Sequence, residues 1–239
     1  MRLHVRACQV TWEIITLLEN GFADGAMARW RTLHEIGVVA TFIAEAGEPT
    51  AARYVAHQAV EAKHGMEEYH RCYEHIGYSP MALAATEKIV RKYNVVVNRY
   101  GSNFATPYGW AAHYLKKKRP TFGDLEATIG RVEMRSHYKL SSYNVHAGPH
   151  AAYFRLGLLD GTSGFLAGVS NAGLVEPGQN TAHTLTQISA LLLSEKRDFD
   201  QMVALQVMTK LRSEIPKAFA KADRKLRRDD AEFKASAQP

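Results

Sequence analysis

The sequence predicts an all-α protein, a single-domain helical bundle with a glycine-rich loop near residues 161–180. Apolar residues recur at helical spacing along most of the chain, whereas alternating runs joined by hairpin turns are not found. Helix start and stop signals separate these periodic segments. Hydrophobic residues make up 46% of the 239 positions, which is enough for a substantial core.

The first two helices are bounded by glycines. An apolar stripe predicts a helix over residues 3–19 that stops at Asn20-Gly21. A second periodic segment over residues 24–46 ends before Gly47.

The next two helices are expected from their caps. Thr50 is a suitable N-cap for a long helix that ends near Gly77. Ser79-Pro80 provides a cap and a first-turn proline for the following helix, which ends near Gly101.

Shorter elements follow. Residues 101–123 are rich in glycine, proline and aromatic residues, and a short helix is expected around residues 108–115. Asp124 is a candidate cap for a further short helix. The next helix carries the most informative motif of the chain, and Gly148-Pro149 is expected to close it.

The C-terminal part combines a loop with two helices. Five glycines predict an ordered loop over residues 161–180. Helices are expected over residues 181–195 and 198–221, followed by a charged tail at 222–239 that is frayed or solvated. No repeat or low-complexity linker divides the chain, so residues 1–221 are predicted to form one domain.

Arg135, Lys139, Ser142 and His146 form the leading candidate site. At about 100° per residue, the other three side chains lie within about 40° of Arg135 on a helical wheel. Two cations, a hydroxyl and an imidazole on one face suit an anionic ligand such as a phosphate. The structural alternative is a buried, hydrogen-bonded His146 near a helix end, with both cations reaching into water.

A second polar group lies on the helix over residues 24–46. Arg31 and Glu35 have the i, i+4 spacing of an ordinary helical ion pair, which favours buried structural pairing. Arg29 lies on a different face from His34. The alternative is a ligand-binding polar centre in which Arg29, Arg31 and Glu35 join His57 and His146.

Histidines and glutamates crowd the segment after Thr50. Glu61-x-x-His64 and Glu67-x-x-His70 resemble the ligand motifs of di-iron helical bundles. Both motifs lie on one helix, and one bundle core cannot easily receive both. The sequence therefore predicts a solvated, ion-paired face, and neither a metal nor another cofactor is assigned.

The glycine-rich segment contains Ser170 and Asn171, which could line a ligand pocket. It lacks the Lys-Ser/Thr that ends a P-loop, so nucleoside triphosphate binding is not predicted. Lys116 to Arg119 form a basic run that is typical of a solvated loop. Beside a basic helical face, the same run would extend a track for RNA phosphates.

Net charge and cysteine content limit the possible partners and the cellular compartment of the protein. Thirty Lys and Arg against 24 Asp and Glu give a net charge of +6, which permits a polyanionic partner. Cys8 and Cys72 give no disulfide framework or zinc-finger spacing, so a reducing cytoplasm is expected. No apolar stretch is long enough to span a bilayer, and no membrane association is predicted.

The segment from Leu17 to Glu35, together with further motifs along the chain, resembles the signature of an uncharacterised bacterial family, domain of unknown function number 5677. The resemblance covers almost the whole chain and begins with Leu17 to Glu35. In that family the segment before this motif is usually longer, which implies a truncated or late start at Met1. The further matching positions are Arg53-Tyr54, His57, Tyr100-Gly101, Tyr108-Gly109-Trp110, Phe122, Ser142, Val145-His146-Ala147 and Gly168 to Leu174.

Tyr138 to His146 is also similar to the final-helix motif of HEPN proteins, helical domains that include metal-independent ribonucleases of toxin and phage-defence systems. Their motif is an Arg, four to six residues, and a His; here Lys139 takes the Arg position. Lysine supplies charge without the two-pronged guanidinium. The resemblance implies that Arg135 and Lys139 hold phosphate, that His146 moves the proton, and that the protein forms a homodimer.

The leading expectation is therefore a cytoplasmic HEPN-like protein that engages RNA or nucleotide phosphate, as a metal-independent endoribonuclease in a defence or toxin setting. The alternative is a non-catalytic helical interaction or small-ligand-binding module, in which the polar residues only fix packing. A metal-dependent bundle enzyme is the third hypothesis.

Overall fold

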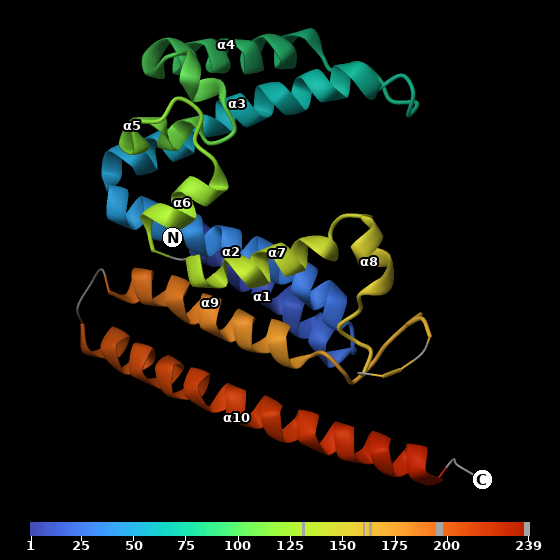
Figure 1. Ribbon diagram of the computed structural model, residues 1–239. Coiled ribbons are helices and arrows are strands. Elements are labelled where there is room, and N and C mark those ends of the chain that lie inside the picture. Colours follow the sequence, from blue (N-terminus) through green and yellow to red (C-terminus); the bar gives the residue numbers. More distant parts are fainter. Residues whose placement is uncertain (131, 160, 163, 195–197, 237–239) are drawn as a thin grey trace. The chain divides into compact units, whose positions relative to one another are not determined.

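The computed structural model is all-α, as the sequence predicts (Figure 1). It describes residues 1–130, 132–159, 161–162, 164–194 and 198–236. Within these ranges the chain forms ten α-helices and three short 3-10 helices, with no strand. None of these helices combines the length and the apolar character that a membrane span needs.

The chain divides into two compact units. The first contains residues 1–41 and 131–239, and the second contains residues 42–130. Helix α2, Ala23–Ala46, belongs to the first unit up to Thr41. The single domain expected over residues 1–221 stays a prediction.

Three helices build the core of the first unit: α1 (Arg2–Glu19), α2 and α9 (Val175–Leu193). The predicted bounds of α1 and α2 are confirmed, and Gly21 follows α1 with a positive φ of 74°. Nine fully or nearly fully buried side chains form one apolar cluster on these helices: Ala7, Val10, Ile14, Ala26, Met27, Trp30, Leu33, Ile36 and Ile188.

The α2–α9 contact is partly polar. The Trp30 indole N–H donates to the Thr184 hydroxyl over 3.1 Å inside the core. Gly37 lets the helices come close, because a Cβ at this position would lie 3.2 Å from the Thr184 methyl group. A buried indole thus has its hydrogen bond satisfied at the centre of the unit.

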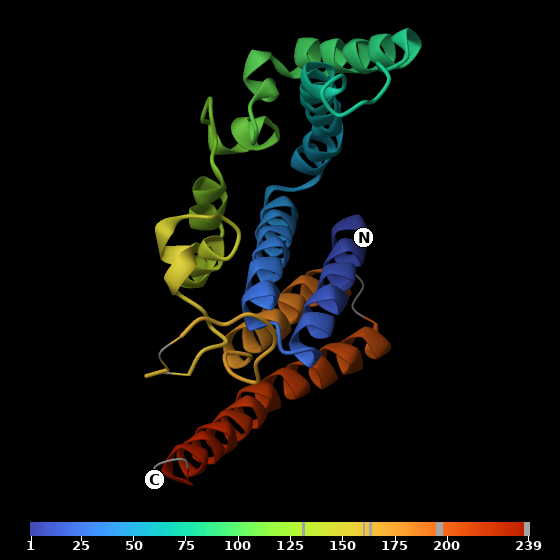
Figure 2. The ribbon, with the colours of Figure 1, turned by 90° about the vertical axis from the view of Figure 1, so that its right-hand side faces the viewer.

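Helix α10, Phe199–Ser236, packs mainly against α9 (Figures 1 and 2). The charged segment after residue 221 is largely exposed, but it continues α10 to Ser236, so the helix end expected at residue 221 is wrong. Oppositely charged side chains at i, i+4 support this last part of the helix. The pairs are Arg227–Asp223, Lys225–Asp229, Arg228–Glu232 and Lys234–Asp230.

Two short helices precede the loop of the first unit: α7 (Arg135–Tyr143) and α8 (Pro149–Tyr153). The 3-10 helix η3, Val132–Met134, leads into α7. Gly148-Pro149 therefore starts a new helix, whereas the sequence analysis expected it to close the one that carries the motif.

The described residues between α8 and α9 are held against the start of α2. The Ser170 amide donates to the Gly21 carbonyl over 2.9 Å, and the Leu156 amide donates to the Asp24 carboxylate over 3.0 Å. Helix α9 begins at Val175, so the last six residues of the predicted loop are helical.

The second unit contains α3 (Glu48–Cys72), α4 (Leu83–Tyr100), η1 (Ser102–Ala105), η2 (Gly109–Ala111), α5 (Ala112–Leu115) and α6 (Phe122–Thr128). Two of the expected caps are wrong. Gly47, with a φ of 78°, is the N-cap of α3, and Thr50 lies in its first turn. Helix α4 starts at Leu83 with Ala82 as its N-cap, so Ser79-Pro80 lies in the connection that precedes the helix.

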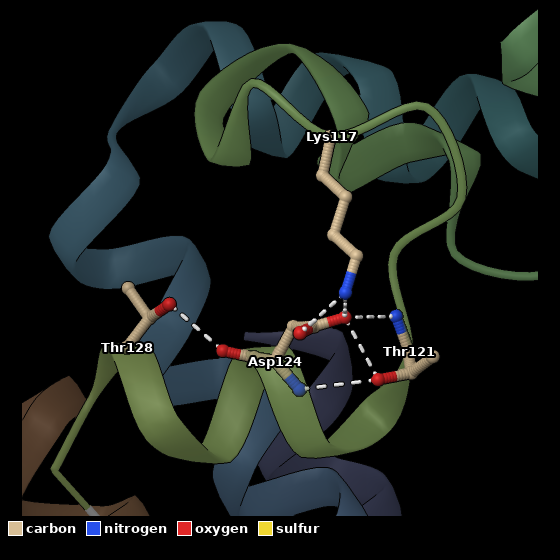
Figure 3. Close-up of polar contacts among 4 residues, drawn as sticks. All are labelled: Lys117, Thr121, Asp124 and Thr128. Carbon is tan, nitrogen blue, oxygen red and sulfur yellow. Dashed lines mark hydrogen bonds and ion pairs between the residues drawn. The ribbon is translucent and has the colours of Figure 1, made fainter.

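Helix α6 begins with a capping box (Figure 3). The Thr121 hydroxyl accepts from the Asp124 amide over 3.3 Å, and the Asp124 carboxylate accepts from the Thr121 amide over 2.7 Å. Thr121 is therefore the N-cap, and Asp124 is the third residue of the helix, which corrects the expected cap. Lys117 donates to both carboxylate oxygens at 2.8 Å.

Candidate functional site

Helix α7 positions the leading candidate residues. Ser141 is buried and Met134 packs against the apolar cluster of the first unit, so these positions mark the inward side. Lys139 and Leu140 are exposed on the outward side. Arg135 and Ser142 are half-buried, which places them along the border between these two sides.

His146 is exposed and lies three residues beyond the end of α7. The expected continuous helix from Arg135 to His146 is therefore wrong in its last part. The Ser142 carbonyl still accepts from the amides of Val145 and His146, each over 3.1 Å. The backbone thus continues for one more turn with helix-like bonds before Gly148-Pro149 changes its direction.

Lys139 and His146 differ from the other candidate residues in their surroundings. Within the described part of the chain, the side chain of neither residue has a hydrogen-bond or ion-pair partner. The Ser142 hydroxyl, in contrast, donates to the Tyr138 carbonyl over 3.0 Å. The candidate set therefore combines two solvent-facing side chains with one hydroxyl that is engaged by its own helix.

A polar cluster joins the inward side of α7 to α2. The Tyr138 hydroxyl accepts from Arg31 over 2.8 Å and donates to Glu35 over 2.7 Å. Arg31 and Glu35 also form the predicted i, i+4 pair at 3.4 Å. The Arg31 guanidinium lies 4.8 Å from the centre of the Tyr138 ring. We call Arg31, Glu35 and Tyr138 the α2–α7 polar cluster.

The α2–α7 polar cluster is partly shielded from water. The His34 ring, 4% exposed, lies between the rings of Trp30 and Tyr138, with centroid distances of 5.3 and 5.5 Å. Burial raises the pKa of Tyr138 to about 12, and the hydrogen bond to the Glu35 carboxylate acts in the same direction. The phenol therefore stays protonated at neutral pH and remains a donor to Glu35.

Two further polar contacts involve half-buried side chains of the first unit. Arg29 pairs with Glu13 of α1, and its guanidinium lowers the pKa of that carboxyl group. His137 of α7 contacts the carboxylate of Glu176 in the first turn of α9. Arg29 thus lies on a different side of α2 from Arg31 and Glu35.

Of the remaining predicted site residues, His57 and Ser170 form hydrogen bonds within the fold. His57 belongs to the second unit, where its Nε2 lies 2.9 Å from the Thr106 carbonyl and its ring packs edge-on against Phe104. The Ser170 hydroxyl accepts from the Ala172 amide over 3.1 Å, and Asn171 is exposed. The Nε2 atom of His57 and the Ser170 hydroxyl are therefore engaged in structural hydrogen bonds.

Glutamates of α3 form ion pairs with basic side chains along the exposed side of the helix. Lys63 pairs with Glu67, and Arg71 pairs with Glu68. In the ranges that the structure describes, no three His, Cys, Asp or Glu side chains gather closely enough to hold a metal ion.

Several residues that contact the predicted site residues were not identified from the sequence. Tyr138 is the centre of the α2–α7 polar cluster, and its i, i+4, i+7 relation to Met134 and Ser141 is a signal that it faces inward. Glu13 has no comparable signal, because it pairs with a residue on another helix. His150 of α8, whose ring lies 4.3 Å from that of Tyr143, was also not singled out.

A family model described as a family of unknown function (DUF5677) matches residues 1–163. The chain belongs to this family. The match includes α1 to α8, and with them the α2–α7 polar cluster, Lys139 and His146. No curated protein and no solved structure matches the chain.

Proposed function

We propose that this protein engages RNA phosphate at the outer edge of α7, and that it cleaves RNA without a metal ion in the manner of HEPN-like ribonucleases. The observation that supports this proposal is the exposure of both Lys139 and His146, neither of which has a partner among the described residues. A cation and an imidazole that make no internal bonds are available to a phosphodiester.

The chemistry needs a charge and a proton carrier. Lys139, with Arg135 beside it on the helix, neutralises the phosphate as negative charge builds up in the transition state. His146 transfers the proton, either from the attacking ribose hydroxyl or to the leaving oxygen. Attack by the 2′-hydroxyl breaks the bond from phosphorus to the 5′-oxygen, leaving a 2′,3′-cyclic phosphate and a free 5′-hydroxyl.

The direct test is RNA cleavage in excess EDTA. The wild-type protein is expected to cut a mixed RNA pool, and His146→Ala and Lys139→Ala each lower the rate by about a hundredfold or more. His113→Ala, which removes an exposed histidine of the second unit, is the matched control and keeps full activity. Lys139→Arg retains cleavage, since arginine holds a phosphate oxygen pair at least as well.

The cleavage products identify the source of the activity. Fragments that end in a cyclic phosphate and disappear with both variants support the proposal. Cleavage that persists unchanged in His146→Ala comes from a contaminating nuclease or from another site, and it contradicts the proposed role of α7.

The second candidate function is a non-catalytic helical interaction or ligand-binding module. It is favoured by the internal bonds of Arg31, Glu35 and Ser142, which fix α7 onto α2 and onto itself. Under this hypothesis, wild-type protein neither cleaves RNA nor binds it in a salt-dependent way, and changes in the α2–α7 polar cluster alter only stability.

A further inference from the structure

The first turns of α10 expose a continuous apolar stripe. Five large hydrophobic side chains between residues 199 and 211 are from 40% to 78% exposed, although α10 packs against α9 along its other side. They are Phe199, Met202, Val203, Val207 and Leu211. An apolar stripe of this length on a helix surface is typical of an interaction site.

The spacing of the residues in the stripe suits packing against a second helix. Phe199, Val203, Val207 and Leu211 follow one another at i+4 and form a ridge along about three and a half turns. A hollow of about 560 Å³ is lined by two further i+4 rows of the same helix, Met202-Gln206-Lys210 and Leu205-Thr209-Ser213. A ridge and a groove of equal spacing on one helix can interdigitate with the same surface of another helix.

The order of residues is symmetric about Leu205. In an antiparallel pair related by a twofold axis at this residue, Phe199 comes level with Leu211 of the second copy and Val203 with Val207. Apolar positions then meet apolar positions along the whole stripe. A parallel pair would instead require Asp200 to meet its own copy.

The charges of the stripe obey the same symmetry. Asp200 lies near its N-terminal end and Lys210 near its C-terminal end, and both side chains are exposed. The antiparallel arrangement brings Asp200 of each copy level with Lys210 of the other. Each acidic end therefore lies next to a basic end of the other copy, which selects this orientation over the parallel one.

We propose that residues 199–211 of α10 form an antiparallel homodimer interface with the same segment of a second copy. The apolar ridge supplies the buried surface, and the opposite charges at its two ends set the register. The inference does not depend on the proposed function, because α10 lies outside the family match over residues 1–163 and contains none of the candidate site residues.

The test is the molar mass of the purified full chain in solution across a range of concentrations, measured by sedimentation equilibrium. The wild-type protein is a dimer. Val207→Glu places a carboxylate among apolar side chains and weakens the dimer by about a hundredfold or more. Val95→Glu, which changes a 64% exposed valine of α4, is the matched control and leaves the dimer intact.

A charge exchange tests the orientation. Asp200→Lys and Lys210→Asp, made singly, place like charges at each end and weaken the dimer by about tenfold. The double variant restores opposite charges and regains the wild-type dimer. Helical circular dichroism equal to that of the wild type shows that each variant is folded.

Three results would overturn the proposal. They are a monomeric wild-type protein at all concentrations, a dimer that survives Val207→Glu, and a double variant that stays as weak as the single variants. Because the readout is mass, failure here is separate from failure of RNA cleavage, which is measured on Lys139 and His146 variants.

Discussion

Tyr138 links the candidate site to the core of its unit through one hydroxyl group. That group accepts from Arg31 and donates to Glu35, so it connects α7 to two residues of α2. Lys139 is the next residue along α7. The position of Tyr138 therefore determines how α7 presents Lys139 to solvent.

Tyr138→Phe is expected to lower the free energy of unfolding by about 1–2 kcal/mol, because it leaves two half-buried charged groups without the hydroxyl between them. Urea unfolding followed by circular dichroism measures this loss. Tyr153→Phe, which changes a tyrosine that is 80% exposed, is the control and has no effect. Equal stability of wild type and Tyr138→Phe would show that the α2–α7 polar cluster contributes nothing to folding.

The Tyr138 phenol also makes the stability of the protein depend on pH in the alkaline range. Its pKa rises from 10.0 in the unfolded chain to about 12 in the folded protein, because burial disfavours the phenolate. The resulting stability is fully present below pH 10 and is lost as the pH rises through about 12. In an alkaline titration of tyrosinate absorbance, Tyr138→Phe therefore removes a late-titrating group.

Helix α6 is stabilised at its N-terminus by the capping box of Thr121 and Asp124. The Asp124 carboxylate accepts from the Thr121 amide and from Lys117, and the latter bond is the largest cause of its low pKa (Figure 3). The pKa falls from 3.8 to about 2, so the contribution of Asp124 to stability is present above pH 3.8 and is lost as the pH falls toward 2.

Asp124→Asn is expected to lower the free energy of unfolding by about 1 kcal/mol at neutral pH, a typical value for a lost cap. Solvent screening keeps the loss this small, since the side chain of Lys117 is half exposed. The difference from wild type shrinks as the pH is lowered below 3.8. Urea midpoints at several pH values measure it, with Glu87→Gln on α4 as control; a pH-independent difference would rule out the carboxylate as its cause.

Helix positions were largely predictable from the sequence, and helix ends were less so. Gly21 and Gly47, both at positive φ, marked the ends of α1 and α2, because few other residues adopt that conformation. Ser79-Pro80 carries the same start signals as a true N-terminus, yet α4 begins at Leu83. Local sequence signals identify the residues that can cap a helix, whereas tertiary packing determines which residue becomes the cap.

The candidate site was predictable only in its local part. The Arg31–Glu35 pair and the exposed Lys139 follow from spacing along one helix. The contact of Tyr138 with both residues of that pair joins positions more than one hundred residues apart in the chain. No spacing rule links two separate helices, so their partners emerge only from the folded arrangement.

The net charge of the whole chain complicates any binding test. A charge of +6 attracts RNA to many surfaces, and the exposed run from Lys116 to Arg119 contributes to this attraction. RNA binding alone therefore does not identify a site. The number of phosphates contacted by one residue is the more specific quantity, because it appears as a change in salt dependence.

Lys139→Ala is expected to weaken RNA binding and to reduce the slope of log K against log salt concentration by about one, the value for one lost phosphate contact. Lys92→Ala removes an equally exposed cation from α4 and therefore changes the net charge by the same amount. If the two variants change the slope equally, general attraction accounts for binding. A smaller slope for Lys139→Ala alone assigns a phosphate contact to α7, because the two chains have the same total charge and differ only in where it was removed.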